Sequence, residues 1–142
     1  MPGLREQLVF PRRQRGPIGA ARRQCQEQGG AKAANPTAVA TDELLRLMIE
    51  TNRVCAEDVA SVFFTTTADL DADFPALAAR ALGWHDAALM CGHEMSVPHG
   101  LPMCIRILIH WNTSMQAADV QHVYIKGAAH LRPDRSFSLK RA

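Results

Sequence analysis

The sequence predicts an α/β or α+β domain whose mixed sheet carries helices on one face. Two patterns support this class. Apolar residues recur at helical intervals between Val39 and Met48, whereas residues 59–67 form a run of β-branched and aromatic side chains that is typical of a strand. Runs of both kinds alternate along the rest of the chain, and a length of 142 residues suits one domain.

The first 36 residues differ in composition from the remainder. They carry seven basic side chains against two acidic ones, a net charge of +5, whereas residues 37–142 carry nine against twelve, a net charge of −3. Residues 1–36 are rich in Arg, Gln and Gly without a sustained period, so we expect an atypical basic arm that is disordered or loosely attached. The acidic balance of the domain at 37–142 argues against a nucleic-acid partner.

The chain has the composition of neither a membrane span nor a secretion signal. No apolar run approaches about 20 residues and no apolar core stands near Met1, so we expect a cytoplasmic protein without a membrane partner. The four cysteines form no Cys-x-x-Cys pair. His93 and His99 lie near Cys91 but match no common ligand spacing, so neither a metal nor another cofactor is predicted.

The domain is expected to begin with a helix and a strand. Pro36 suits the first helical position, and Asn52 is a plausible stop for a helix that covers one face of the sheet. The strand at 59–67 follows. An acidic loop then leads to a second, short helix over residues 76–82, which Gly83 ends.

Two further strands are expected around the segment 91–106. An apolar run at 87–90 leads into this segment, a β-branched and aliphatic run at 105–109 leads out of it, and a turn rich in proline and glycine joins the two. Residues 116–124 then have the spacing of a short helix, and residues 128–131 form a short apolar strand. The polar tail after that strand is expected to fray.

Glu94 closes the first of these two strands, and Arg106 opens the second. Both charges therefore stand where apolar side chains would be expected. Charged residues are rarely buried unless they are paired or used in a site. A structural ion pair at a strand end explains them as well as a functional site does.

The other candidate groups divide into a weak catalytic pair and a set suited to binding. Cys91 and His93 are a conceivable nucleophile and base, but side chains two apart on a strand extend in parallel and meet poorly. Two guanidiniums, a carboxylate and a phenol would suit a small dianionic ligand better than proton transfer, and these groups belong to Arg106, Arg132, Glu94 and Tyr124.

Six short motifs follow one another between Thr67 and Asp134. They are Thr67-Ala-Asp-Leu with Asp73-Phe74-Pro75-Ala76, Gly83-Trp84, Cys91-x-x-Glu94-Met95, Cys104-Ile105-Arg106-Ile107, His122-Val-Tyr124 and Leu131-Arg132-Pro133-Asp134. In this order they resemble the trimeric α/β class of chorismate mutases, and the likeness covers about residues 41–134. It implies a chorismate-mutase-like fold, closed as a trimeric pseudo-barrel with three sites at subunit interfaces.

The resemblance implies an isomerase that rearranges chorismate to prephenate, on the way from the shikimate pathway to phenylalanine and tyrosine. The implied catalytic residues are Arg106, at the ether oxygen of the breaking bond, and Glu94 and Cys91, which contact the ring hydroxyl. A unimolecular rearrangement of this kind needs no nucleophile, base, metal or cofactor, only a substrate held in the reactive shape beside a fixed cation. The implied partners are chorismate, prephenate and two further copies of the chain.

The resemblance also implies a set of residues that bind substrate. Tyr124 and Arg132, with Leu131 beside them, would hold a carboxylate. The backbone around Gly92 and His93 would form one wall of the pocket. The neighbouring subunit would add Phe74, Ala76, Leu89 and Met90.

Two departures from the family pattern stand out. Leu77 occupies a position where the family often has a lysine, and residues 1–36 do not read as the family's first strand with its Arg-Gly-Ala-Thr-like motif. Arg15 with Gly16 is the nearest match, so Arg15 is the candidate for the substrate-binding arginine of that strand. Two other functions therefore stay open: a trimer that binds a small ligand without catalysis, which includes a mutase inactive for lack of its first strand, and an interaction protein that uses the basic arm.

Overall fold

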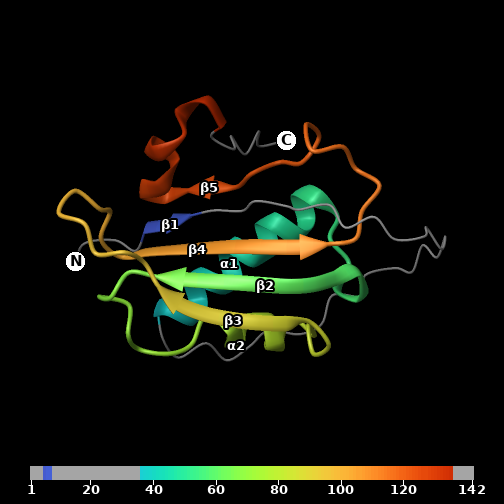
Figure 1. The fold of residues 1–142 in the computed structure, drawn as a ribbon, viewed down its shortest axis with the longest axis horizontal. Helices are drawn as coiled ribbons and strands as arrows, with labels where there is room; N and C mark the ends of the chain where they lie inside the picture. Colours follow the sequence, from blue (N-terminus) through green and yellow to red (C-terminus); the bar gives the residue numbers. More distant parts are fainter. Residues whose placement is uncertain (1–4, 8–35, 136–142) are drawn as a thin grey trace.

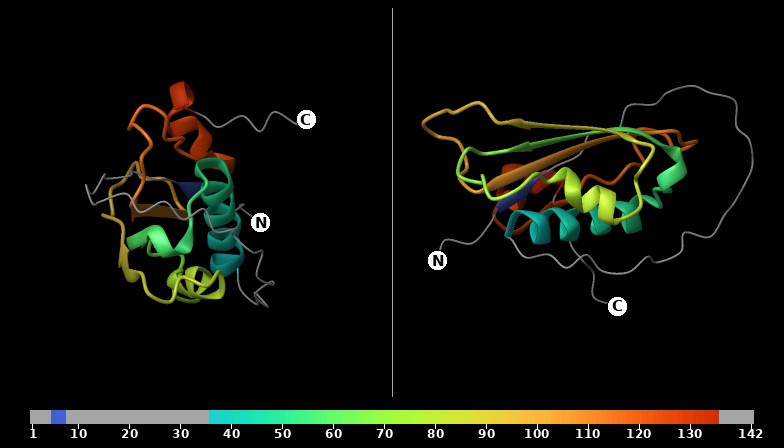
Figure 2. Two further views of the ribbon diagram at one scale, coloured as in Figure 1. Left: turned by 90° about the vertical axis from the view of Figure 1, so that its right-hand side faces the viewer. Right: turned by 90° about the horizontal axis from the view of Figure 1, so that it is seen from below.

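The computed structural model describes residues 5–7 and 36–135. Within them, a five-stranded mixed sheet has the strand order β3-β2-β4-β1-β5. Helix α1 (Pro36–Asn52) and the short helix α2 (Ala76–Ala81) both lie against one face of this sheet (Figures 1 and 2). The predicted class, a mixed sheet with helices on one face, is confirmed.

Helix α1 begins and ends where the sequence predicts. Its apolar residues Leu44, Leu45 and Met48 are buried against the sheet, so helical spacing places them on the face that packs. At its end, the side-chain amide of Asn52 donates to the backbone carbonyl of Met48, and Arg53 adopts a left-handed φ of 53°. A residue in this conformation terminates a helix.

An inner strand of the sheet is β2 (Val59–Thr66), where the sequence predicts a strand over residues 59–67. It runs parallel to β3 (Ala88–His93) and antiparallel to β4 (Cys104–Trp111). Because side chains alternate along a strand, Val62 and Phe64 of β2 are buried beneath the helices. The buried residues of β4 are Ile105, Ile107 and Ile109.

The opposite face of the sheet is not covered by either helix, and we call it the open face. Register pairs Thr65 with Arg106 and Phe63 with Leu108 across β2 and β4, and Thr65 with Gly92 across β2 and β3. The open face is made up of Ser61, Phe63, Thr65, Met90, Gly92, Arg106, Leu108 and His110.

The expectation that a turn joins the two strands around segment 91–106 is wrong in one respect, because these strands are not neighbours in the sheet. Strands β3 and β4 are present, but β2 lies between them. The chain from 94 to 103 therefore crosses over the end of β2 instead of making a hairpin. Local sequence pattern marks strands and turns, but strand order depends on contacts between distant residues.

The segment 116–135 corrects two further predictions. Residues 116–123 form one turn at 117–119 and otherwise irregular backbone, not a helix. Strand β5 is only Tyr124–Ile125, and residues 126–131 form a 3₁₀ helix (Lys126–Leu131) and not a strand. The side chain of Asn52 donates to the carbonyl of Gln121 at 2.9 Å and accepts from its N–H at 2.8 Å. Backbone groups that are engaged by another element cannot also complete a local helix.

A three-residue strand, β1 (Arg5–Gln7), pairs in parallel with β4 and antiparallel with β5. No strand is predicted in this arm, and for these three residues that prediction is wrong, because a strand this short has no side-chain period to detect. Residues 8–35, and Arg15 with them, lie outside the described part of the chain. The division of the chain at residue 37 stays a prediction.

Candidate active site

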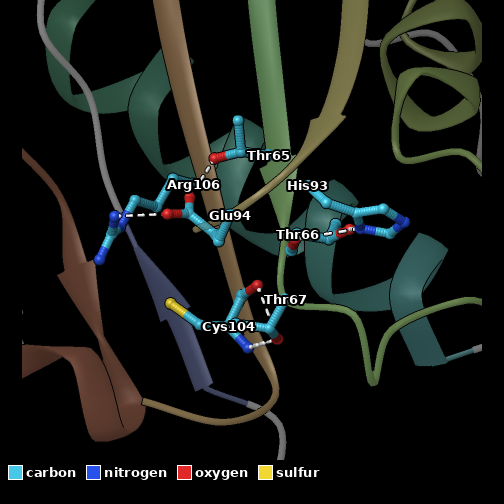
Figure 3. A network of polar contacts seen from close by, with 7 residues as sticks. All are labelled: Thr65, Thr66, Thr67, His93, Glu94, Cys104 and Arg106. Carbon is cyan, nitrogen blue, oxygen red and sulfur yellow. Dashed lines mark hydrogen bonds and ion pairs between the residues drawn. The ribbon is translucent and has the colours of Figure 1, made fainter. Parts of the chain in front are cut away.

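An ion pair lies on the open face, beside residues 94–103, which cross over the end of β2. Arg106 is the third residue of β4, and its Nη1 donates to Oε2 of Glu94 at 2.7 Å (Figure 3). Glu94 directly follows β3, and its own backbone N–H donates to the carbonyl of Thr66 at 2.8 Å. This bond holds the main chain of Glu94 at the end of β2, from where its carboxylate reaches the guanidinium of Arg106.

The second oxygen of this carboxylate is also engaged. The hydroxyl of Thr65, on β2, donates to Oε1 of Glu94 (Figure 3). The Glu94 side chain is only 17% exposed, whereas the Arg106 side chain is 45% exposed. The Glu94 carboxylate is thus largely buried at the end of the sheet, whereas the Arg106 guanidinium is partly exposed to solvent.

A second polar cluster fixes the start of β4. The hydroxyl of Thr67 accepts from the N–H of Cys104 at 2.9 Å and donates to Asp69. Asp69 also accepts from the N–H of Met103 at 2.9 Å, at a residue whose φ is 53°. This clamp holds the backbone two residues before Arg106. The hydrogen bond from Thr67 lowers the pKa of Asp69, and burial raises the pKa of the Cys104 thiol.

Cys91 and His93 do not form a catalytic pair in the described chain. Cys91 pairs in register with the buried Phe64, so it is turned towards the helices and packs at the edge of the core. The Nδ1 atom of His93 lies 3.3 Å from both the hydroxyl and the carbonyl oxygen of Thr66. One chain therefore does not bring the Cys91 thiol to the face that carries Arg106.

The other candidate residues fall into two groups at opposite edges of the sheet (Figure 1). Tyr124 is buried in β5, and Arg132 makes a bidentate ion pair with Asp134 at 2.9 and 2.8 Å, which raises the pKa of Arg132. Leu131 is exposed beside it. At the other edge, Phe74 precedes α2, Ala76 begins it, and β3 carries Leu89, Met90 and Gly92. Phe74 is 69% exposed and Met90 59% exposed.

The Glu94–Arg106 pair offers a bound molecule an oriented positive charge. Among them, no three His, Cys, Asp or Glu side chains are grouped so that they could hold a metal ion. No helix among them is long and apolar enough to cross a membrane. A guanidinium oriented by a fixed carboxylate can stabilise negative charge that develops on a bound molecule.

Sequence similarity to known proteins identifies the family of this chain. The model of the family "Chorismate mutase type I" matches residues 30–135. This chain belongs to that family. It is 47% identical to the chorismate mutase AroH of Thermus thermophilus over 67% of this chain and 79% of the relative, and 39% identical to that of Bacillus subtilis over 69% and 78%.

A solved structure agrees with these relatives. A chorismate mutase from Clostridium thermocellum superposes with a TM-score of 0.66 at 45% identity, over 68% of this chain and 87% of that one. The resemblance drawn from the six motifs is confirmed, as are the fold and the isomerase activity. The protein is a chorismate mutase that converts chorismate to prephenate in aromatic amino acid biosynthesis.

The hydroxyl groups that support this chorismate mutase site are not predicted from the sequence. Thr65 appears in the sequence only as part of a β-branched strand. Thr67 and Asp69 belong to the first of the six motifs, but the motif assigns them no role. The available signal was the run of three threonines at the end of β2. A hydroxyl at every position there is more than a strand needs for its packing, since valine packs equally well.

Proposed function

We propose that Arg106 is the catalytic cation of this chorismate mutase. The rearrangement breaks the ether C–O bond while a new C–C bond forms within the same molecule, and negative charge builds on the ether oxygen. A permanent, oriented guanidinium stabilises that charge and needs no proton transfer. The observation that carries the proposal is the position of Arg106 on the open face, with its guanidinium aligned by a doubly bound Glu94.

Glu94 is proposed to have two tasks. Its carboxylate orients Arg106, and it accepts a hydrogen bond from the ring hydroxyl of chorismate. The low exposure of the Glu94 side chain supports this, because a carboxylate fixed before substrate arrives loses little freedom on binding. Cys91 is proposed, from the family resemblance alone, to contact the same ring hydroxyl, although its side chain projects from the face of β3 opposite to that of Arg106.

The carboxylates of chorismate are proposed to meet Tyr124 and Arg132. A guanidinium that already forms a bidentate pair with Asp134 has the geometry for a substrate carboxylate, which would compete with Asp134 for it. Arg15 remains the proposed third ligand and lies outside the described residues. These carboxylate contacts would hold the side chain of chorismate over its ring.

A homotrimer is proposed as the working form, with chorismate and prephenate as its ligands in the cytoplasm. The two groups of candidate residues stand at opposite edges of the sheet in one chain, so a second copy is needed to bring them together. The apolar side chains on the open face support burial there, because Phe63 and Met90 are 36% and 59% exposed. The pocket would then combine Arg106 of one subunit with Phe74 and Met90 of the next.

The experiment that tests this function follows the loss of chorismate absorbance. Wild-type protein should consume chorismate, and Arg106→Ala should lower kcat by at least about 10²-fold, the usual effect of removing a transition-state donor. Arg46→Ala is the matched control, because Arg46 is also a half-exposed arginine paired with a carboxylate, on α1. Normal turnover in a folded Arg106→Ala protein would contradict the assignment. An inactive wild-type trimer would instead favour the ligand-binding alternative.

A further inference from the structure

We infer that Thr65 is a positioning residue for this reaction: its hydroxyl holds Glu94 so that Arg106 points to the ether oxygen. The inference rests on the proposed role of Arg106. Thr65 itself acts through the carboxylate and has no proposed contact with substrate.

The placement of Thr65 follows from the sheet register. Thr65 on β2 stands directly opposite Arg106 on β4, so both side chains project from the open face. On its other side, Thr65 pairs with Gly92 on β3, two residues before Glu94. Thr65 therefore lies between the strand that carries the cation and the strand that delivers the carboxylate.

Open space lies beside this arrangement at Gly92. Within the described residues, a Cβ at Gly92 would have no neighbour within 4 Å. The register position beside Thr65 on β3 is thus empty of side-chain atoms, and the Glu94 carboxylate reaches Thr65 from beyond the strand end (Figure 3).

The two carboxylate oxygens have different partners. Oε1 accepts from Thr65, and Oε2 accepts from Nη1 of Arg106 at 2.7 Å. A glutamate has three rotatable side-chain bonds, so one hydrogen bond alone leaves its carboxylate free to turn. The second bond, from a residue within a central strand, fixes the carboxylate plane and with it the direction of a guanidinium that is 45% exposed.

The test compares kcat and KM for chorismate in matched variants. Thr65→Val removes the hydroxyl but keeps the branched shape, and we expect kcat to fall roughly tenfold, the lower end for a hydrogen bond to a charged group, with little change in KM. Thr65→Ser keeps the donor and should stay within about threefold of wild type. Ser61→Ala is the control, because Ser61 is on the same face of β2 and its hydroxyl pairs with His110 instead.

A double-variant cycle separates positioning from a general effect on the fold. In a Glu94→Ala background, Thr65→Val should cause no further loss of kcat, because the carboxylate it holds is gone. An equal loss of kcat in both backgrounds would overturn the inference. A Thr65→Ser variant with kcat as low as that of Thr65→Val would also overturn it. Thr65→Ala gives a second measurement if the valine variant does not fold.

The outcome also distinguishes this inference from the function on which it rests. If Arg106→Ala is inactive and Thr65→Val turns over normally, the proposed cation stands and the role of Thr65 is wrong. If Arg106→Ala turns over normally, the proposed function itself is wrong.

Discussion

Arg106 owes its direction to its neighbours more than to its own strand. Its side chain is 45% exposed, and an exposed ion pair contributes only about 0–1 kcal/mol to stability. The pair with Glu94 is therefore better understood as a device for orientation. Its contribution should be seen in kcat, because the activation barrier depends on where the positive charge of Arg106 lies.

Asp69 links residue chemistry to acid stability. The hydrogen bond from Thr67 holds the pKa of this carboxyl below its ordinary value of 3.8. Because the folded pKa lies below the unfolded one, the ionised form contributes stability above about pH 3.8, and this contribution is lost as the pH falls through the folded pKa.

We therefore predict that Asp69→Asn lowers the free energy of unfolding at neutral pH and that its difference from wild type shrinks as the solution is acidified below about pH 4. Urea denaturation at a series of pH values measures this. Asp71→Asn, in the same loop, is the control. A difference between wild type and Asp69→Asn that stays constant from neutral to about pH 3 would refute the account.

Part of the site can be predicted from single residues and part cannot. Glu94 and Arg106 stand out because charges interrupt apolar runs, and the structure pairs them. Cys91 has no such signal from the sequence alone, and its strand turns it to the helix side. Thr65 escapes prediction because a strand favours threonine for its shape, so the hydroxyl looks incidental until the register places it opposite Arg106.

At the scale of elements, local pattern predicts what packs as a regular unit. Helices α1 and α2 and strands β2, β3 and β4 have caps or periods that a window of residues reveals. The order of the strands cannot be predicted in this way, because β2 lies between β3 and β4 through contacts between residues that are far apart in the chain. The helix predicted over residues 116–124 is wrong, because the side chain of Asn52 engages the backbone of Gln121.

The role of Asn52 gives a prediction at this scale. Its buried side chain exchanges two hydrogen bonds with the backbone of Gln121 and ties α1 to the turn that leads to β5. Asn52→Ala leaves these backbone groups without partners and should lower the free energy of unfolding by about 1–3 kcal/mol. Chemical denaturation measures the change. Asn112→Ala, at an exposed asparagine, should have almost no effect, and equal effects of the two variants would argue against the tie.

The whole molecule is expected to function as an assembly. One chain carries an open face with exposed apolar side chains and divides its candidate residues between two sheet edges. Light scattering should therefore give three times the 15.6 kDa of one chain at micromolar concentration.

Met90→Asp should weaken this trimer and reduce turnover together, because a buried, unpaired carboxylate is costly at an apolar interface. Val39→Asp is the control, since Val39 is 50% exposed on α1, outside the open face. A monomer in wild-type protein, or a Met90→Asp variant with an intact trimer and full activity, would contradict the shared pocket.

The central claim is that Arg106 acts on the transition state more than on bound substrate. The measurement that tests it most directly is the separate effect of Arg106→Ala on kcat and KM for chorismate, with the folded trimer verified. An interaction made mainly in the transition state lowers kcat and kcat/KM alike. We predict that kcat falls by about 10²–10³-fold while KM changes little. A rise in KM with kcat unchanged would show that Arg106 only binds substrate, and the account would then be wrong.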